Sequence, residues 1–312
     1  MRRIISFFLI ISIVFLSGCL DFTSNSDSNE DYQDLSFEIL NVPDTIQSGQ
    51  VFNPVLRIKN SGKYSIPSSG IFVKILNTQQ FNVDLSTQTN DNQEFISESL
   101  TNIYPIKGKV LDSEYGDIFD FTFNEVKIST FLNPGEKTIF NLEQCHKYRT
   151  QVFSYICISK DSYGQTCNSA EKKSTSVSSN DIEIKNFEQI NSIASGQNVA
   201  STLNLEGKYL DLSSISTNDD MNCLDDKIRN TIKLDSIQIG SKVIDNIDKY
   251  CNSNLIYLNK NNEFKIICNG LPTYDAWTKS SIDFTERITF NFNYMKSDII
   301  SKDLSIIYNK KI

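Results

Sequence analysis

Alternation of apolar and polar residues dominates the chain after its N-terminal segment. In the longest case, residues 282–294, Ile, Phe and Tyr occupy every second position and only Glu286 breaks the period. Residues 118–126 and 138–142 show the same alternation, whereas 151–159 is a mostly apolar run. Alternation with period two indicates strands with one covered and one wet face, which is typical of an antiparallel sandwich. No long stretch after the N-terminal segment keeps a helical period, so the pattern predicts an all-β protein.

The two halves of the chain carry matching segments. Three short stretches recur at offsets of 145 to 147 residues: 37–42 as 182–187, 48–50 as 195–197, and 62–64 as 207–209. A repeat of this length indicates a duplicated domain, because solenoid units span roughly 20 to 50 residues. We therefore predict two tandem immunoglobulin-like antiparallel β-sandwich domains, covering residues 35–166 and 182–312.

Two polar segments interrupt this pattern. Residues 167–181 hold one Val among Ser, Lys, Asn and Asp, and we interpret them as a linker between the domains. Residues 77–117 are polar and acidic and longer than a sandwich connection needs to be. We expect an extra hairpin or an exposed loop within them.

The N-terminus has the features of an export signal. Arg2 and Arg3 precede a nearly continuous apolar run, 4–16, and the tetrad 16–19 (LSGC) resembles the lipobox of lipoproteins. This resemblance implies that residues 1–18 are removed and that Cys19 carries the lipid that anchors the chain to the outer face of the cytoplasmic membrane. The alternatives are an ordinary secretory signal and an uncleaved signal anchor. The Ser-, Asn- and Asp-rich residues 19–34 are interpreted as a flexible tether.

Cysteine usage agrees with export. Without Cys19, six cysteines remain, and an even number in an exported chain predicts disulfides with 15 possible pairings. The candidates are Cys145, Cys157, Cys167, Cys223, Cys251 and Cys268. Three precede residue 170 and three follow residue 220, so either one bridge crosses between the two regions or two thiols stay free.

Charge and histidine content exclude several functions. The chain has a formal net charge of −8, and removal of the signal leaves 28 basic against 38 acidic residues, a net charge of −10. Nucleic-acid binding requires a basic surface, so we expect no nucleic-acid partner. His146 is the only histidine, which removes most catalytic constellations, and we expect it at an exposed strand end.

Several motifs resemble those of a known group of proteins. The segments 52–58 and 58–62 resemble strand B and its turn in CARDB-like immunoglobulin-type modules of archaeal cell surfaces. The regions from Cys145 to Cys167 and from Cys223 to Cys268 are similar to uncharacterised archaeal exported lipoproteins. The resemblance implies a surface-exposed, disulfide-bridged fold without an established activity.

Two candidate ligand sites stand out. The loop 218–226 is the densest acidic cluster, and its carboxylates could hold Ca²⁺, or it could be an ordinary exposed loop; the candidate ligands are Asp219, Asp220, Asp225 and Asp226. Trp277, with Tyr274 and Asp275, could stack on a sugar, or it could pack at an edge of the sheet.

The sequence favours a surface lipoprotein that acts as a binding, adhesion or envelope-structural module, without catalysis and without a cofactor. We expect its partners to be the membrane, through the N-terminus, and a protein or glycan at the cell surface. One alternative is a subunit of a surface filament or envelope assembly joined by β-strand addition. Another is an envelope hydrolase that uses acidic loops near Asp117 or Asp219.

Overall fold

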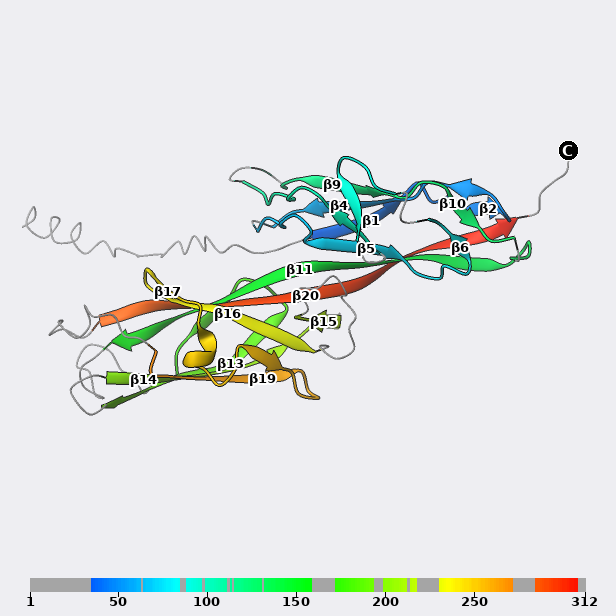
Figure 1. Cartoon of the computed structure of the whole chain (residues 1–312). Helices are drawn as coiled ribbons and strands as arrows, with labels where there is room; N and C mark the ends of the chain where they lie inside the picture. Colours follow the sequence, from blue (N-terminus) through cyan, green and yellow to red (C-terminus); the bar gives the residue numbers. More distant parts are fainter. Residues whose placement is uncertain are drawn as a thin grey trace, which may run out of the picture. The chain divides into compact units, whose positions relative to one another are not determined.

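The structure of the chain, a computed structural model, is all-β, as the alternation predicts, and its strands pair antiparallel except for β2 with β20 (Figure 1). It describes residues 35–62, 64–84, 88–96, 99–110, 113, 115–130, 132–158, 172–193, 199–211, 214–217, 230–271 and 284–307. Within these ranges no helix is long and apolar enough to cross a membrane. The signal, Cys19 and the tether lie outside the described residues.

Two three-stranded sheets have the same order, one in each half of the chain. The first consists of β1 (Leu35–Leu40), β4 (Val55–Asn60) and β9 (Ile118–Thr122), with β4 in the middle. The second consists of β13 (Ile182–Ile193), β14 (Val199–Tyr209) and β19 (Glu263–Asn269), with β14 in the middle. The matching segments 37–42 and 182–187 therefore begin sheets of the same order.

An eleven-stranded sheet contains most of the remaining strands. Its main path runs β17 (Lys242–Ile244), β16 (Thr231–Ile239), β20 (Phe284–Ile307), β11 (Lys137–Ile158), β5 (Ile71–Ile75), β8 (Ser99–Asn102) and β7 (Gln93–Ile96). Four short strands pair beside this path: β2 (Thr45–Gln47), β12 (Thr175–Val177), β15 (Ser214–Ser216) and β18 (Leu255–Tyr257). Outside it lie the small sheet of β3 (Val51–Phe52), β10 (Val126–Ile128) and β6 (Phe81–Asn82), and the 3₁₀ turn η2 (Ile247–Lys249).

The strands β11 and β20 form a two-stranded ribbon that belongs to both halves of the protein. They pair without interruption from Lys137 opposite Ser305 to Ile158 opposite Phe284. Figure 1 shows the green and red strands side by side along this length. At residue spacings of about 3.3 Å, the 22 residues of β11 span about 70 Å, far more than one sandwich requires.

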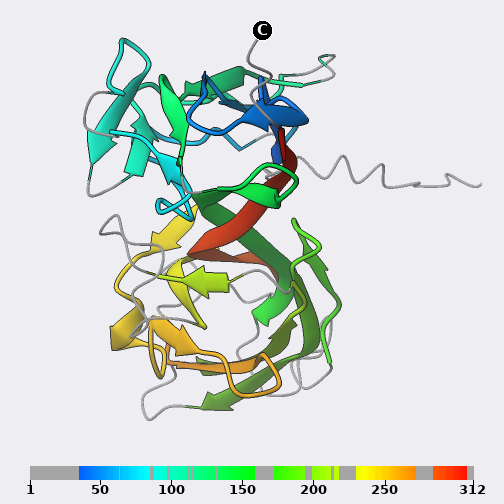
Figure 2. The ribbon, with the colours of Figure 1, turned by 90° about the vertical axis from the view of Figure 1, so that its right-hand side faces the viewer.

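Each end of the ribbon contributes to a different hydrophobic core. The N-terminal core contains Phe140 and Leu142 of β11 together with Leu304 and Ile306 of β20. The C-terminal core is built on the opposite end, with residues that include Val152, Ile156, Ile288, Phe290 and Phe292. Figure 2 shows the orange β19 facing the ribbon across the C-terminal core. The arrangement differs from the expected tandem domains, because the last strand of each half serves both cores.

The even-numbered residues of β11 and β20 make up the inner face of the ribbon, which packs on both cores. Side chains alternate across a strand, and the register places even residues opposite even residues. This face is mostly apolar toward its two ends but polar in the middle, where Gln144 lies opposite Asp298 and His146 opposite Lys296. Tyr148 lies opposite Tyr294 next to them, with the two rings stacked at 5.3 Å between centroids.

The two interrupting segments contain more structure than a linker or a loop. Within 167–181, residues Thr175–Val177 form β12, which pairs with β11 at Val152–Ser154. Within 77–117, β7 and β8 form the hairpin that the sequence predicts, with Gln93 opposite Asn102.

The edges of the three-stranded sheets differ in their protection. The Gln93 side chain bonds both backbone groups of Thr122 on β9, and the side chain of Asn252 accepts a hydrogen bond from Ile267 N on β19. Strand β1 pairs with β4 on one side and, within the described part of the chain, with no strand on the other. Its outer edge is therefore the least protected of these edges.

Candidate functional site

A cleft of about 560 Å³ opens beside the polar middle of the ribbon. Its wall is mixed: apolar side chains come from β1 and β12, and polar or charged ones come from the ribbon and from the turn after β12. The lining residues are Leu35, Phe37, His146, Tyr148, Val177, Ser178, Ser179, Asn180, Asp181, Lys296 and Asp298. A concave site with a few convergent polar groups is the usual form of a ligand site.

The turn 178–181 is held in place by the ribbon itself. Ser178 N donates to Gln151 O at 2.9 Å, and Gln151 N donates to the Ser178 hydroxyl at 2.8 Å. The hydroxyl of Ser179 lies 2.9 Å from that of Thr150, which in turn lies 3.0 Å from the hydroxyl of Tyr294. The turn is thereby fixed against the inner face, so the cleft is largely preformed.

A hydrogen-bond relay orients the buried histidine. The Gln144 amide donates from Nε2 to Asp298 Oδ2 at 3.0 Å, and Gln144 Oε1 lies 2.8 Å from His146 Nδ1. Because a carboxylate only accepts, the amide nitrogen must face Asp298 and its oxygen must face the imidazole. His146 therefore carries its proton on Nδ1, and Nε2 is left as an acceptor.

An ammonium group sits among three carboxylates at the same place. Lys296 Nζ pairs with Asp211 and lies 3.5 Å from Asp181 Oδ1, while Asp298 stands two residues along β20. The side chains of Lys296, Asp181 and Asp211 are 16%, 13% and 27% exposed, so this network is mostly shielded from water. Lys296 also lies 5.3 Å from the ring centre of Tyr148.

Burial governs the pKa values of this cluster. It raises the pKa of both Asp181 and Asp298, although the charge of Lys296 acts in the opposite direction. Burial alone would lower the pKa of Lys296, but hydrogen bonding to Asp211 and the nearby carboxylates outweigh it, so the pKa is raised. Burial, with the charge of Lys296, lowers the pKa of His146 to about 3. His146 is therefore neutral near pH 7, whereas Lys296 is charged.

The expected position of His146 is wrong. We expected it at an exposed strand end, but it lies in the middle of β11 and is only 2% exposed. The two strands expected at 138–142 and 151–159 form the single strand β11, which carries His146 across the junction between the cores. The sequence also gave no reason to group Lys296 and Asp298 with it.

The described disulfide joins two of the six candidate cysteines. Cys251 and Cys268 are bridged at an S–S distance of 2.08 Å and are both buried, so they fasten the edge of β19 to the segment after η2. Cys145 and Cys157 are also disulfide-bonded, to partners outside the described residues. At about 3.3 Å per residue along one strand, they lie too far apart to bond to each other.

The other candidate residues fall elsewhere. Cys167, Cys223, Trp277 and the four calcium candidates of the loop 218–226 lie outside the described residues. No group of three or more His, Cys, Asp or Glu that could hold a metal ion is found within the described ranges. Asp117 is exposed, and its carboxylate accepts a hydrogen bond from Lys107 N at 2.9 Å in a surface turn.

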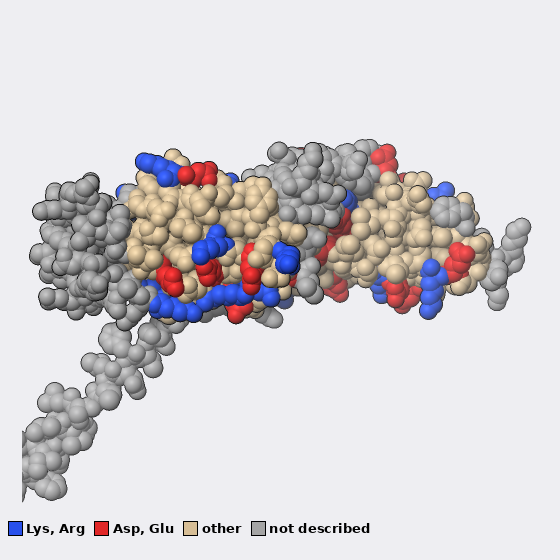
Figure 3. All heavy atoms as spheres, turned by 90° about the horizontal axis from the view of Figure 1, so that it is seen from below, with Lys and Arg blue, Asp and Glu red and all other residues tan. Residues whose placement is uncertain are grey.

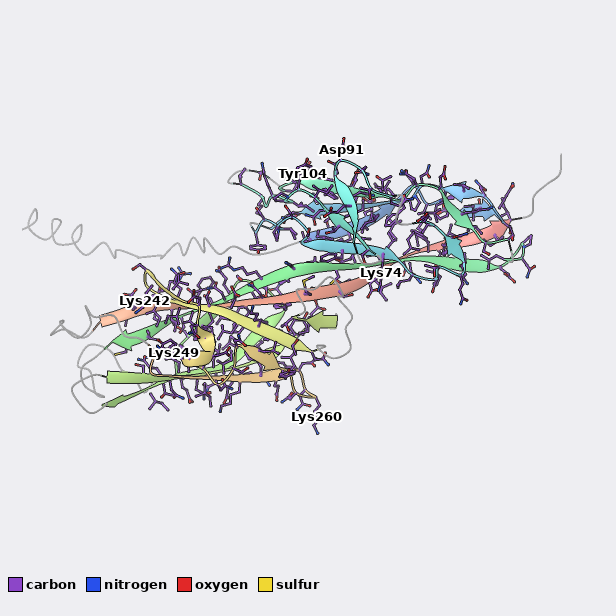
Figure 4. All side chains as sticks on the ribbon, in the orientation of Figure 1. Lys74, Asp91, Tyr104, Lys242, Lys249 and Lys260 are labelled. Carbon is purple, nitrogen blue, oxygen red and sulfur yellow. A yellow bond between two sulfur atoms is a disulfide. The ribbon has the colours of Figure 1, made fainter. Side chains whose placement is uncertain are left out.

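A second cavity, of about 410 Å³, lies on the outer face of the sheet β13–β14–β19. Its charged lining is already paired, Lys185 with Glu263 and Lys265 with Glu206. Figure 3 shows this face from below, where basic and acidic side chains are interleaved. Figure 4 shows Lys260 pointing outward from the same half. Exposed ion pairs of this kind contribute little free energy, and these charged groups are already paired with each other. We therefore regard the cleft on the ribbon as the candidate site.

The buried histidine makes a specific contribution to acid sensitivity. The folded protein holds the pKa of His146 near 3, below the 6.5 of a free imidazole. Between these two pH values the unfolded chain therefore binds a proton at His146 that the folded chain does not bind. The resulting stability is present above about pH 6.5 and is lost as the pH falls, by about 1.4 kcal/mol per pH unit between about 6 and 4. Chemical denaturation from pH 4 to 7 should show this extra slope in the native chain and not in His146→Gln. The raised carboxyl pKa values act oppositely but are common to both chains, so parallel curves would contradict the assignment.

Comparison with known proteins gives no family. No family model matches the chain, and no curated protein matches it. Among solved structures, the collagen-binding domain of the Erysipelothrix rhusiopathiae surface protein RspB is 10% identical, with 91% of this chain and 92% of that chain covered and a TM-score of 0.17. A chaperone–tip adhesin complex of CFA/I fimbriae biogenesis is 9% identical, with 88% of each chain covered and a TM-score of 0.10. Scores this low carry no argument, so the function is argued from the residues of the chain.

Proposed function

We propose that the chain is a membrane-anchored extracytoplasmic lipoprotein whose cleft binds a protein or glycan partner at the cell surface without catalysis. One observation carries the proposal: charged and polar side chains gather on the inner face of the ribbon where the cleft opens, whereas most inner-face residues on both sides of it are apolar. Removing charges from water costs several kcal/mol per ion, and apolar residues would avoid that cost. Polar and charged residues at positions where core packing favours apolar ones are expected at functional sites.

Disulfide bonding supports the compartment. The buried Cys251–Cys268 bridge, together with bonded Cys145 and Cys157, fits an oxidising environment outside the cytoplasm. A lipid on Cys19, followed by the tether 19–34, would hold the two cores at the membrane surface. The cleft would then face partners within reach of the cell envelope.

The protonation states in the cleft favour binding over catalysis. A general base works best with a pKa near the working pH, and that of His146 is lowered to about 3. A nucleophilic lysine must lose its proton, and the pKa of Lys296 is raised. Both groups are therefore suited to hydrogen bonding and charge pairing near neutral pH.

A photo-cross-linker placed in the cleft tests the proposal. Val177 lines the cleft from β12 and is half-buried, so p-benzoylphenylalanine at this position would touch a bound partner. We expect irradiation of intact cells to give a discrete adduct from this position. Val243, on the edge strand β17 and 58% exposed, is the matched control and should give none. Equal adducts from both positions, or none from Val177, would refute binding in the cleft.

A hydrolase remains the second candidate, because one observation favours it. Asp181 and Asp298 line the same cleft and both have raised pKa values, and a raised pKa is what the general acid of a carboxylate pair requires. This pair differs from the acidic loops near Asp117 and Asp219 in which the sequence placed such a site. Turnover of an envelope glycan that is lost in Asp298→Asn would support this function over binding alone.

Strand addition, the filament alternative, would use β1. Its outer edge has no strand partner within the described ranges, and Glu38 is the only charged residue among Leu35–Leu40. Because Leu35 and Phe37 also line the cleft, a strand added there would lie beside the proposed binding site.

A further inference from the structure

We propose that the cleft recognises an alkylammonium group, the chemistry shared by a lysine side chain and a polyamine. This inference rests on the proposed binding function and names its ligand class. It follows from three properties of the cleft: its excess of negative charge, its buried hydrogen-bond acceptors and its aromatic wall.

Charge is the first property. Asp181 and Asp298 line the cleft and Asp211 stands beside it, whereas Lys296 is the one cation among the lining residues. His146 is neutral near pH 7, so the lining of the cleft has two carboxylates and one ammonium. Lys296 is itself committed to Asp211 and Asp181, so it offers little charge to a ligand. A cleft with one excess sign of charge concentrates ligands of the opposite sign.

The second property is the presence of buried hydrogen-bond acceptors. His146 is 2% exposed and lines the cleft, and the relay from Asp298 through Gln144 fixes its proton on Nδ1. Nε2 is then a lone-pair acceptor. Asp181 Oδ2 is buried and has no hydrogen-bond partner among the residues that the structure describes. A buried acceptor without a donor is unfavourable, which makes a ligand that supplies donors favourable.

Aromatic rings supply the third property. Phe37 and Tyr148 flank His146, with ring centroids at 5.7 and 5.8 Å from that of the imidazole. Tyr148 already has one ammonium, that of Lys296, 5.3 Å from its ring centre. Aromatic faces attract cations, and more strongly where water is excluded. The methylene groups of an alkylammonium would also pack on Leu35 and Val177, which line the same wall.

These properties exclude an anionic ligand. An anion would face the carboxylates of Asp181 and Asp298, and Lys296 is already paired. An ammonium group donates three hydrogen bonds and accepts none, which matches a wall that offers His146 Nε2 and carboxylate oxygens.

Calorimetric titration of the full chain, purified in detergent, with n-butylammonium tests the inference. At pH 7 we expect saturable binding that is about tenfold tighter than that of butan-1-ol, which has the same alkyl chain without the charge. Asp298→Asn should weaken it about tenfold. Asp303→Asn is the matched control, because Asp303 lies on the same strand, is exposed and points to the other face, and it should leave the affinity within about twofold. Binding should also weaken between pH 7 and pH 4, as the carboxylates take up protons.

Two further probes distinguish the source of the ammonium group. Nα-acetyl-lysine methylamide represents a protein side chain and spermidine represents a polyamine, and the tighter of the two names the source. Equal binding of butan-1-ol and butylammonium, or tighter binding of acetate, would overturn the inference. If either result occurs while Val177 still yields its adduct in cells, the cleft binds a partner of other chemistry and the proposed function stands. If the adduct is also absent, both fail.

Discussion

Replacing Phe187 with alanine is expected to destabilise both cores, although Phe187 belongs to only one of them. This side chain of β13 is fully buried in the C-terminal core and packs edge-on against Phe290 of β20, with 5.6 Å between ring centroids. Removing a buried Phe side chain costs about 3 to 5 kcal/mol. Since β20 continues into the N-terminal core, the loss should reach that core through the ribbon.

The matched variant is Phe81→Ala in the other core. Phe81 of β6 is also fully buried and packs edge-on against a ribbon residue, Phe140 of β11, at 5.1 Å. Urea denaturation should give one transition for each variant, with the free energy of unfolding lowered by about 3 to 5 kcal/mol in both. Two separate transitions, with only the mutated core shifted, would mean that the cores are independent domains.

Replacing Lys296 with methionine is expected to cost about 3 kcal/mol of stability. The substitution keeps most of the side-chain volume but removes the ammonium that pairs with Asp181 and Asp211 in a mostly buried setting. The carboxylates then repel one another and remain shielded from water in the folded state, whereas in the unfolded chain they are hydrated, so only the folded state is destabilised. Denaturant midpoints at pH 7 measure the effect, and part of the loss should be recovered in the triple variant that also carries Asp181→Asn and Asp211→Asn.

Lys302→Met provides the control for this substitution. Lys302 lies on the same face of β20, but its partner Asp44 is 86% exposed, so the loss should stay below about 0.5 kcal/mol. If both lysine variants lose equal stability, the network around Lys296 has no special role in the fold.

Period-two alternation was sufficient to predict the fold class but not the extent of the ribbon. The apolar pattern of the last strand stops at Tyr294, although the strand continues to Ile307. The reason is physical: Lys296 and Asp298 occupy inner-face positions where an ordinary strand would have apolar residues. The same happens on β11, where Gln144 and His146 separate two apolar runs.

These two interruptions were the available signal for the candidate site. Each is visible in the sequence as a break in alternation, but the site appears only when Gln144 lies opposite Asp298 and His146 opposite Lys296. That register depends on a pairing between residues about 150 positions apart, which local patterns do not encode. Asp181 was assigned to a linker for the same reason, since only the hydrogen bonds of the turn 178–181 to the ribbon bring it into the cleft.

The duplication also hid the connection between the halves. The matching segments 37–42 and 182–187 lie in two three-stranded sheets of the same order, β1–β4–β9 and β13–β14–β19. A repeat of complete domains would let each half fold separately. Nothing in the repeated segments shows that β11 and β20 contribute to both cores. The two halves instead share β11 and β20, and the cleft lies where the shared strands pass from one core to the other.

Native-state hydrogen exchange of the full chain tests the central claim, that one ribbon makes a single body of the two cores, most directly. The amides to compare are those of β5 in the N-terminal half and β16 in the C-terminal half, which flank the ribbon on β11 and β20. We expect the slowest amides of both strands to exchange with the same free energy of opening and to shift together in Phe187→Ala. Slow amides that open with two distinct energies, with only those of β16 shifting in the variant, would contradict the claim.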